Sequence, residues 1–384
     1  MSRPRTPPVR DVQVRSELPF ERWLRDQTDV AALLLVALGL SARLLAARGS
    51  FLSPDEALHL QIASVPGVLD TYRATLMNAH PPLFALLLHF WKRIAASPWE
   101  LRLLPAVFGT AFLWAAYRWA RSLFGKAPAL MTLALLAFLP SLVIVSAELR
   151  GYSVMLCLAA AALASLERTF EGRSAVGLGL FTGLAGLALL SHYAALWFAL
   201  AAFAYSAVRI AAQRYPARFA LSWAASWAVL AVLFLSLYMT HISRLRGGAL
   251  EQEARIDWLR ASYFRAGYES PLLFLARQTL ALFHFLFSES AAGAVALFLL
   301  IFGIAHLARR RQPAAILLAL PFVFSAAAGL LDRYPYGGTR HSIDLVLFAA
   351  AGVGVALAQL VGNRLWAAIV LAAVMAPAGF AVGL

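Results

Sequence analysis

The chain has 384 residues, of which 61% are hydrophobic, and its mean hydropathy is +0.73. Soluble domains are about 45–50% apolar, so this composition excludes an ordinary soluble protein. The apolar runs predict helices, because backbone groups inside lipid must be hydrogen-bonded within the segment. The formal net charge is +14. Basic residues between membrane spans set topology and meet anionic lipid, so we predict membrane lipid as a partner and exclude nucleic acid.

Residues 1–28 are charged, contain prolines and lack the apolar core of a signal peptide. We expect a cytoplasmic tail there, followed by a single transmembrane domain over 29–384. A crossing helix needs about 20 residues. Thirteen apolar segments follow in chain order, at 29–47, 80–96, 101–122, 128–147, 151–168, 174–190, 193–210, 219–240, 271–288, 292–308, 313–331, 342–361 and 365–383.

Four clusters of basic residues orient these segments, because positive loops stay in the cytoplasm. The clusters are Arg118, Arg121 and Lys126; Arg168 and Arg173; Arg209, Arg214 and Arg218; and Arg309, Arg310 and Arg311. They share one face if 80–96 and 271–288 do not fully cross. We therefore predict an all-α polytopic bundle of 11–13 segments, with eleven full crossings preferred. The polar stretches 48–79, 241–270 and 332–341 then lie outside, and the first of them carries juxtamembrane helices.

Two adjacent acids directly follow the first span. Ser53 is suited to a helix N-cap and Pro54 to the first turn, where the helix dipole favours the carboxylates of Asp55 and Glu56. Neighbouring side chains on a helix point about 100° apart, so the two acids are expected to do different jobs. One is a candidate general base for a hydroxyl. Glu56 and His59 stand three residues apart, a spacing that also fits two ligands of a divalent metal. The simpler alternative is that Asp55 and Glu56 are surface acids that only complement the helix dipole.

Further polar breaks between apolar segments fall on the same predicted outer face. Arginine forks suit phosphate oxygens, while tyrosines at such breaks are also typical of the interfacial aromatic belt. His80 precedes two prolines, which are equally consistent with a helix start. The candidates from these breaks are His80, Glu148, Arg150, Tyr152, His192, Tyr193, Arg340 and His341.

The order of these motifs resembles the GT-C glycosyltransferases. The resemblance rests on Asp55-Glu56 after a first span, then His80-Pro81-Pro82-Leu83, Leu101-Arg102-Leu103-Leu104-Pro105 and Glu148-x-Arg150-x-Tyr152. The most similar branch contains protein O-mannosyltransferases, lipid A aminoarabinose transferases and bacterial lipopolysaccharide-core sugar transferases. It covers about residues 29–210 well and the C-terminal third loosely. We expect no soluble C-terminal domain like that of the larger members, so that the acceptor recognition it supplies there is either absent or comes from 241–270.

The resemblance implies that Asp55 is the catalytic position and that Glu56 and His80 line its pocket. It also implies a hexosyl- or pentosyltransferase of the bacterial inner membrane, with its active site on the extracytoplasmic face. The donor would be a polyprenyl-phosphate-linked sugar and the acceptor a glycan, lipid or protein hydroxyl, with inversion and no required cofactor. The predicted substrate-binding set is Glu56, His80, Arg102, Glu148, Arg150, Tyr152, His192, Tyr193, Arg340 and His341.

Two other classes of membrane protein are alternatives. An O-antigen polymerase or ligase also uses external arginines and lipid-linked sugars, but it needs no pair of acids after the first span. A lipid or sugar transporter or flippase often shows related halves and interrupted helices near the bilayer midplane. The sequence shows no internal repeat, and its polar residues gather at one face. A glycosyltransferase therefore remains the preferred interpretation.

Overall fold

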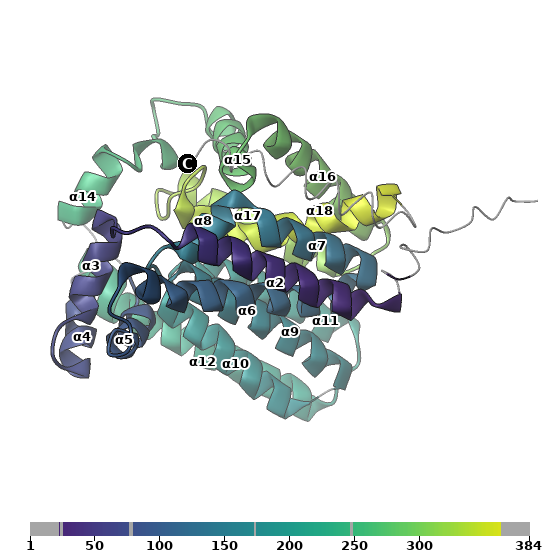
Figure 1. The fold of residues 1–384 in the computed structure, drawn as a ribbon. Helices are drawn as coiled ribbons and strands as arrows, with labels where there is room; N and C mark the ends of the chain where they lie inside the picture. The colour runs from purple at the N-terminus through teal and green to yellow at the C-terminus, as the bar shows by residue number, and fades with distance from the viewer. Residues whose placement is uncertain (1–22, 24–25, 77–79, 173, 246–248, 362–384) are drawn as a thin grey trace, which may run out of the picture.

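The structure is a computed structural model that describes residues 23, 26–76, 80–172, 174–245 and 249–361. Within these ranges every regular element is a helix, which confirms the predicted all-α class. Figure 1 shows the long helices running side by side as one bundle. These helices are α2 (Thr28–Ala46), α6 (Pro98–Phe124), α9 (Tyr152–Gly172), α10 (Ala175–Ser191), α11 (Ala195–Ala212), α12 (Ala217–Leu237), α16 (Ser290–Arg309), α17 (Ala314–Leu330) and α18 (Val346–Val361).

Six helical segments in the described part of the chain are long and apolar enough to cross a membrane. They are Thr28–Ala46, Tyr152–Gly172, Ala195–Ala212, Ala217–Ile242, Ser290–Arg309 and Arg340–Val361. A seventh results if α7 (Lys126–Phe138) and α8 (Pro140–Ala147) form one span, which is bent by 58°. The sequence predicted a single segment over 128–147, and the proline divides it. The predicted segment 365–383 lies outside the described residues.

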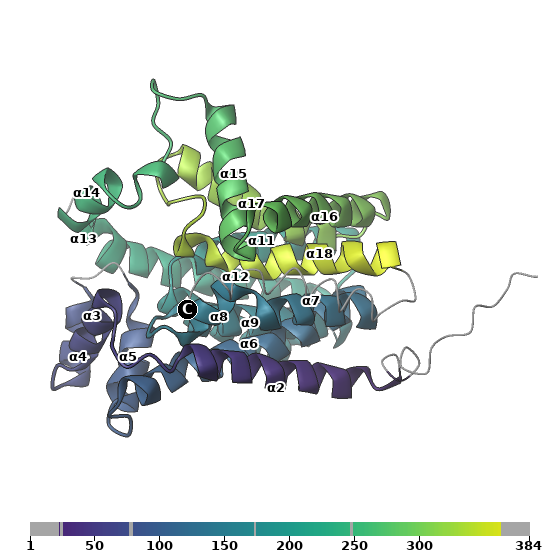
Figure 2. The ribbon, with the colours of Figure 1, turned by 45° about the horizontal axis from the view of Figure 1, so that its top comes forward.

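The segments 80–96 and 271–288, predicted to cross the membrane only partly, differ from the long helices of the bundle in length or direction. Helix α5 (Pro82–Trp91) has ten residues and is about 15 Å long, half the roughly 30 Å of a hydrocarbon core. It therefore cannot span by itself, which disfavours thirteen full crossings. Helix α15 (Pro271–Phe287) runs at a steep angle to α16 and α18 in Figures 1 and 2. Such an orientation fits a helix that does not cross with the bundle.

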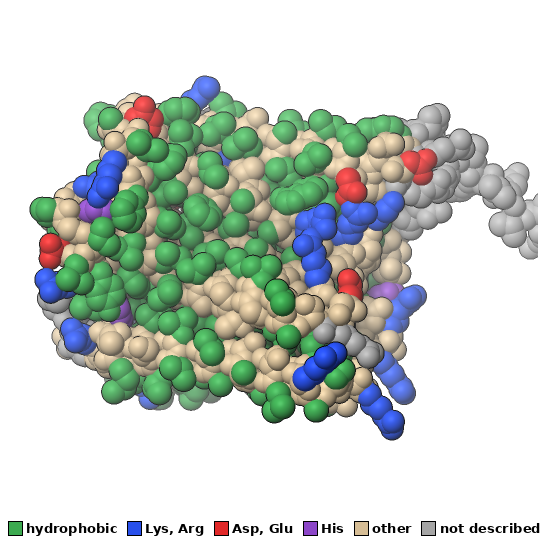
Figure 3. All heavy atoms as spheres, turned by 90° about the horizontal axis from the view of Figure 1, so that it is seen from below, with side chains coloured by type: hydrophobic (Ala, Val, Ile, Leu, Met, Phe, Trp, Pro, Cys, Tyr) green, Lys and Arg blue, Asp and Glu red, His purple; other side chains and the backbone are tan. Residues whose placement is uncertain are grey.

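The two ends of the bundle differ in character. One end carries α5 and the short helices α3 (Pro54–Ala63), α4 (Val68–Thr75) and α14 (Ala249–Ile256) (Figure 1). Lys and Arg side chains gather at the other end, where α2 begins (Figure 3). Helices α6, α9, α11 and α16 all finish there, so the described members of the four basic clusters lie at one end of the bundle, as predicted.

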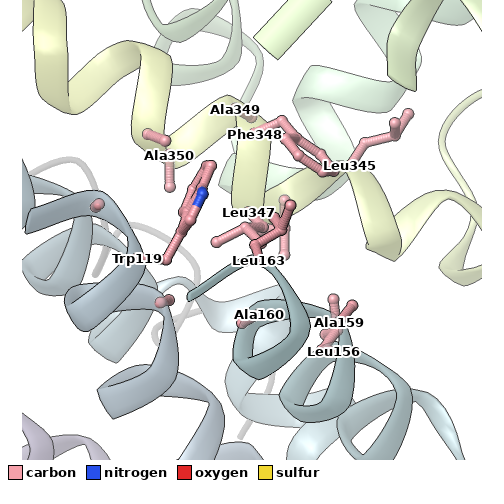
Figure 4. Packing of buried hydrophobic residues seen from close by; sticks show 14 of the residues in the cluster. Trp119, Leu156, Ala159, Ala160, Leu163, Leu345, Leu347, Phe348, Ala349 and Ala350 are labelled. Carbon is pink, nitrogen blue, oxygen red and sulfur yellow. The ribbon is translucent and has the colours of Figure 1, made fainter. Parts of the chain in front are cut away.

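Close helix packing holds the centre of the bundle together. The Trp119 ring meets the Phe348 ring edge-on at 6.1 Å, and Figure 4 shows both among alanines and leucines of α9 and α18. Helices α16 and α18 approach so closely that a Cβ atom on Gly303 would lie 2.2 Å from the carbonyl oxygen of Gly352. Small residues allow such contact, and dispersion between closely packed helices replaces the hydrophobic effect inside lipid.

The orientation of the bundle predicts opposite labelling of two exposed positions. Gln61 lies on α3 and Arg214 lies between α11 and α12, at opposite ends. In a Cys157→Ser background, a membrane-impermeant thiol reagent added to intact cells should label Gln61→Cys and not Arg214→Cys. Inverted vesicles should give the reverse pattern. Labelling of both positions from the same side would contradict the topology.

Candidate active site

Asp55 and Glu56 lie in the first turn of α3, where the chain leaves α2 and turns back toward the bundle. Ser53 Oγ accepts a hydrogen bond from the Glu56 backbone N–H at 3.4 Å, and the Ser53 N–H donates to Glu56 Oε2 at 2.9 Å. This reciprocal pair is a capping box, and Pro54 occupies the first turn as the sequence predicted. The cap fixes where both carboxylates leave the helix.

Asp55 lies between two arginines from distant parts of the chain. Arg150 Nη2 and Arg340 Nη2 both contact Asp55 Oδ2, the latter at 2.6 Å. The Arg150 side chain is only 7% exposed, whereas those of Asp55 and Arg340 are 45% and 38% exposed. Glu148 Oε2 lies 3.9 Å from Arg150 Nε and 3.7 Å from Arg340 Nη1. Two acids and two arginines therefore form one cluster of balanced charge, which we call the acid–arginine cluster.

A cavity of about 350 Å³ opens beside this cluster. Its polar lining includes Glu148, Arg340 and His341, and its apolar lining includes Ile144 of α8 and Phe285 of α15. Burial raises the pKa of Glu148, although the charges of the two arginines oppose this shift. The cavity thus combines a polar end, which holds one acid and one arginine, with an apolar wall.

Glu56 points away from Asp55 into a buried ion pair. Its carboxylate accepts hydrogen bonds from Arg102 Nε and Nη2 at 2.7 Å each, and from the Ser53 and Leu149 N–H groups at 2.9 Å each. A carboxylate offers about four lone-pair sites, so these four bonds use them all. Burial by itself raises the pKa of Glu56, but its hydrogen bonds with Arg102, Ser53 and Leu149 outweigh burial and lower the pKa to about 2.

Arg102 is equally committed to the protein. Besides Glu56, its guanidinium donates to the carbonyl oxygens of Gly49 at 2.6 Å and Phe51 at 2.7 Å. The substrate contacts predicted for Glu56 and Arg102 are therefore not favoured by the geometry. The pair instead joins α6 to the end of α2, the start of α3 and the backbone before α9.

A row of aromatic side chains runs inward from the acid–arginine cluster. The ring centroids are 4.9 Å apart for His59 and His80, 5.8 Å for His80 and His192, and 4.6 Å for His192 and Tyr152. Arg150 and these four rings line a cavity of about 10 Å³, roughly the size that holds one water. Burial lowers the pKa of His59 to about 4 and that of His192 to about 3, so both are neutral at pH 7.

The divalent metal considered for Glu56 and His59 does not fit this arrangement. Glu56 has its acceptor sites occupied by Arg102 and two backbone N–H groups. The His59 ring packs against His80 and, edge-on, against Phe84 at 5.6 Å. Across the described ranges, no three His, Cys, Asp or Glu side chains are grouped closely enough to hold a metal ion.

The two remaining predicted residues are Tyr193 and His341, and the latter also lines the larger cavity. Tyr193 OH and His341 Nδ1 are buried without a hydrogen-bond partner among the described residues. Tyr334 OH donates to the His341 carbonyl oxygen at 3.2 Å, and the Tyr334 ring contacts Trp197. Sequence reasoning included Tyr334 only as part of the polar stretch 332–341, and it did not identify Trp197 or the apolar lining of the cavity. Their residue types are those of any lipid-facing or interfacial position, so no sequence signal marked them.

The buried ion pair predicts a pH-dependent stability defect. Arg102→Met leaves the Glu56 charge without its counter-ion and should cost about 3–5 kcal/mol at pH 7. Because the pKa of Glu56 is lowered to about 2, the parent keeps this stabilisation above its ordinary pKa of 4.5 and loses it as pH falls toward 2. The difference between variant and parent, measured by thermal unfolding in detergent, should shrink below pH 4.5. The exposed Arg73→Met is the control, and an equal effect of both variants would refute a special role for Arg102.

Residues 79–242 match the family model described as dolichyl-phosphate-mannose-protein mannosyltransferase. No curated protein sequence matches the chain. Among solved structures, the apo oligosaccharyltransferase of Archaeoglobus fulgidus superposes with a TM-score of 0.60 at 12% identity, covering 95% of this chain and 55% of that one. Another structure of the Archaeoglobus protein, AglB, holds an inhibitory peptide and a dolichol-phosphate, with a TM-score of 0.57.

ArnT from Cupriavidus metallidurans in the apo state superposes with a TM-score of 0.55 at 16% identity, covering 88% of this chain and 61% of that one. ArnT bound to undecaprenyl phosphate gives a TM-score of 0.51. The chain thus spans between half and two thirds of the length of these structural relatives. Together with the family match, they confirm the resemblance drawn from the sequence motifs: the chain has the GT-C fold of membrane glycosyltransferases.

Proposed function

We propose that the protein is an inverting glycosyltransferase of the bacterial inner membrane. It moves a hexose or pentose from a polyprenyl-phosphate donor to a hydroxyl of a glycan, lipid or protein on the extracytoplasmic face. The observation that carries this proposal is the position of Asp55 between Arg150 and Arg340, beside a cavity with an apolar wall. A base, cations for a phosphate and a surface for a lipid tail are then available at one place.

The donor fits the chemistry of the cavity. Arginine forks bind phosphate oxygens with two parallel hydrogen bonds, and Arg340 lines the cavity. Ile144 and Phe285 supply apolar surface on which an isoprenoid chain can lie. The structural relatives that hold a dolichol-phosphate and undecaprenyl phosphate support the same class of donor.

The reaction follows from the charges in the cluster. Asp55 takes the proton of the acceptor hydroxyl, whose oxygen attacks the anomeric carbon from the side opposite the phosphate. The bond between that carbon and the phosphate oxygen breaks, and the polyprenyl phosphate leaves with one further negative charge. Arg150 and Arg340 stabilise this charge, because donors already in place cost no reorganisation in the transition state.

Asp55 becomes available as a base through an exchange of partners. In the structure both arginines contact its Oδ2 atom. Arg340 is partly exposed at the cavity, so an arriving donor phosphate can compete with Asp55 for its guanidinium. Arg150 is buried and keeps its contact, which holds Asp55 in place. Donor binding thereby releases the carboxylate from one of its two cations.

Asp55→Asn provides the sharpest test of the base. The amide keeps the size of the side chain but cannot accept the acceptor proton, so turnover should fall about 10²-fold or more. Undecaprenyl phosphate binding should survive, as measured by calorimetry on monodisperse protein. Asp70→Asn, on the exposed face of the neighbouring helix α4, is the matched control and should keep full activity. A fully active Asp55→Asn enzyme would remove the base from the mechanism.

The donor class predicts a second outcome in proteoliposomes. Sugars carried on polyprenyl phosphate should be transferred, and the same sugars carried on nucleotides should not. Arg340→Lys should weaken undecaprenyl phosphate binding about tenfold, because lysine loses the bidentate fork. Mass spectrometry of the products identifies both sugar and acceptor. Comparable turnover with nucleotide sugars would refute the proposal.

A further inference from the structure

Arg43 lies in the first spanning helix, α2, and is fully buried. Within the described part of the chain, its hydrogen bonds all go to carbonyl oxygens. Nη1 donates to Gly39 at 2.9 Å and to Ala137 at 3.2 Å, and Nη2 donates to Leu136 at 3.2 Å. An arginine at membrane depth without an acidic partner is costly and therefore points to a specific role.

The carbonyl groups of Leu136 and Ala137 need the Arg43 guanidinium as a donor, because helix α7 ends there. In a continuous helix the Leu136 carbonyl would accept from the N–H of residue 140, but Pro140 has none. Leu139 has ψ 118°, the extended conformation expected before proline, so α7 stops. Unpaired carbonyls inside a membrane cost several kcal/mol each, and the end of a helix carries negative partial charge. The Arg43 guanidinium donates hydrogen bonds to these carbonyls, and its positive charge offsets the negative partial charge at the end of α7.

Two glycines make room for the guanidinium. A Cβ atom on Gly39 would lie 3.3 Å from Arg43 Nη1 and 2.6 Å from Leu113 Cδ1. A Cβ atom on Gly109 would lie 3.2 Å from Arg43 Nε and 2.5 Å from Ser146 Oγ. Helices α2 and α6 therefore close around the arginine and the next helix, α8.

Helix α8 is the short element that carries this break to the acid–arginine cluster. It has eight residues, is turned by 58° from α7, and ends at Ala147, directly before Glu148. At its first turn Ser141 Oγ donates to the Leu286 carbonyl oxygen at 2.7 Å. Arg43 on one side and Ser141 on the other thus determine where α8 points.

We propose that Arg43 is a positioning residue for the active site. By pairing the carbonyls freed at the break, it keeps α7 and α8 bent, and the bend places Glu148 and Arg150 against Arg340 and Asp55. The functional consequence rests on the proposed function, whereas the bend itself does not.

The test separates a general loss of stability from a loss of position. Arg43→Met keeps the length of the side chain and leaves the carbonyls unpaired, so the melting temperature should fall. Arg43→Met combined with Pro140→Ala restores an N–H for Leu136 and permits a straight helix. The double variant should regain most of the melting temperature while α8 points elsewhere. The affinity of the double variant for undecaprenyl phosphate should remain at least tenfold below that of the parent. The single variant Arg43→Lys, which keeps a positive charge, should retain part of the parental affinity.

A distance measurement reads the bend without reference to function. Nitroxide labels on Phe51→Cys and Ile144→Cys, both exposed, report the distance from the first loop to α8 in a Cys157→Ser background. The distance should change in the double variant, stay unchanged in Pro140→Ala alone because Arg43 still holds the two carbonyls, and stay unchanged in Arg209→Met. That control breaks a buried ion pair with Glu167 between α9 and α11, in the opposite half of the bundle.

Two results would overturn the inference: an unchanged label distance in the double variant, or parental undecaprenyl phosphate affinity despite a changed distance. If the parent itself does not bind undecaprenyl phosphate, the proposed function fails. In that case the distance still decides whether Arg43 maintains the bend.

Discussion

The buried ion pair between Glu56 and Arg102 is the constraint on which the acid–arginine cluster depends. Burying two opposite charges is tolerable only when their hydrogen-bonding capacity is used, and here four bonds to the carboxylate and several to backbone carbonyls use it. These partners belong to the end of α2, the start of α3, the interior of α6 and the turn before α9. Asp55 is next to Glu56 in the chain, and Arg150 is next to Leu149, so both adjoin a member of this hydrogen-bond network. The network therefore sets the distance between Asp55 and Arg150.

The grouping of charged residues could be predicted from the sequence where helix geometry and membrane topology led to the same arrangement. Adjacent acids on one helix had to point in different directions, and a shared outer face had to collect the arginines. The structure does bring Arg150 and Arg340 to Asp55. The substrate roles predicted for Glu56 and Arg102 stay predictions, although the structure pairs these two side chains with each other. Nothing in a local motif shows that a carboxylate is already paired with an arginine 46 residues later, because that depends on the tertiary fold.

Hydropathy likewise identified apolar segments but not their breaks. The segment 128–147 is apolar throughout, so α7 and α8 looked like one span, although Pro140 is a breaker by its lack of an N–H. Its consequence could not be predicted, because a proline either kinks a helix or begins one. The structure resolves the choice through Arg43, which lies about 95 residues earlier and supplies the missing donors.

The electrostatics of the site explain why a charged donor can enter it. Two acids, Asp55 and Glu148, face two arginines, Arg150 and Arg340, and burial keeps His59 and His192 neutral, so the cluster holds as many acidic as basic side chains. In the proposed reaction, an arriving donor phosphate brings a negative charge that Arg340 accepts by loosening its contact with Asp55, while the buried Arg150 keeps its own contact. Charged histidines would give the phosphate other cations and leave Asp55 paired. Their neutrality therefore supports the proposed coupling of donor binding to the release of Asp55 from Arg340.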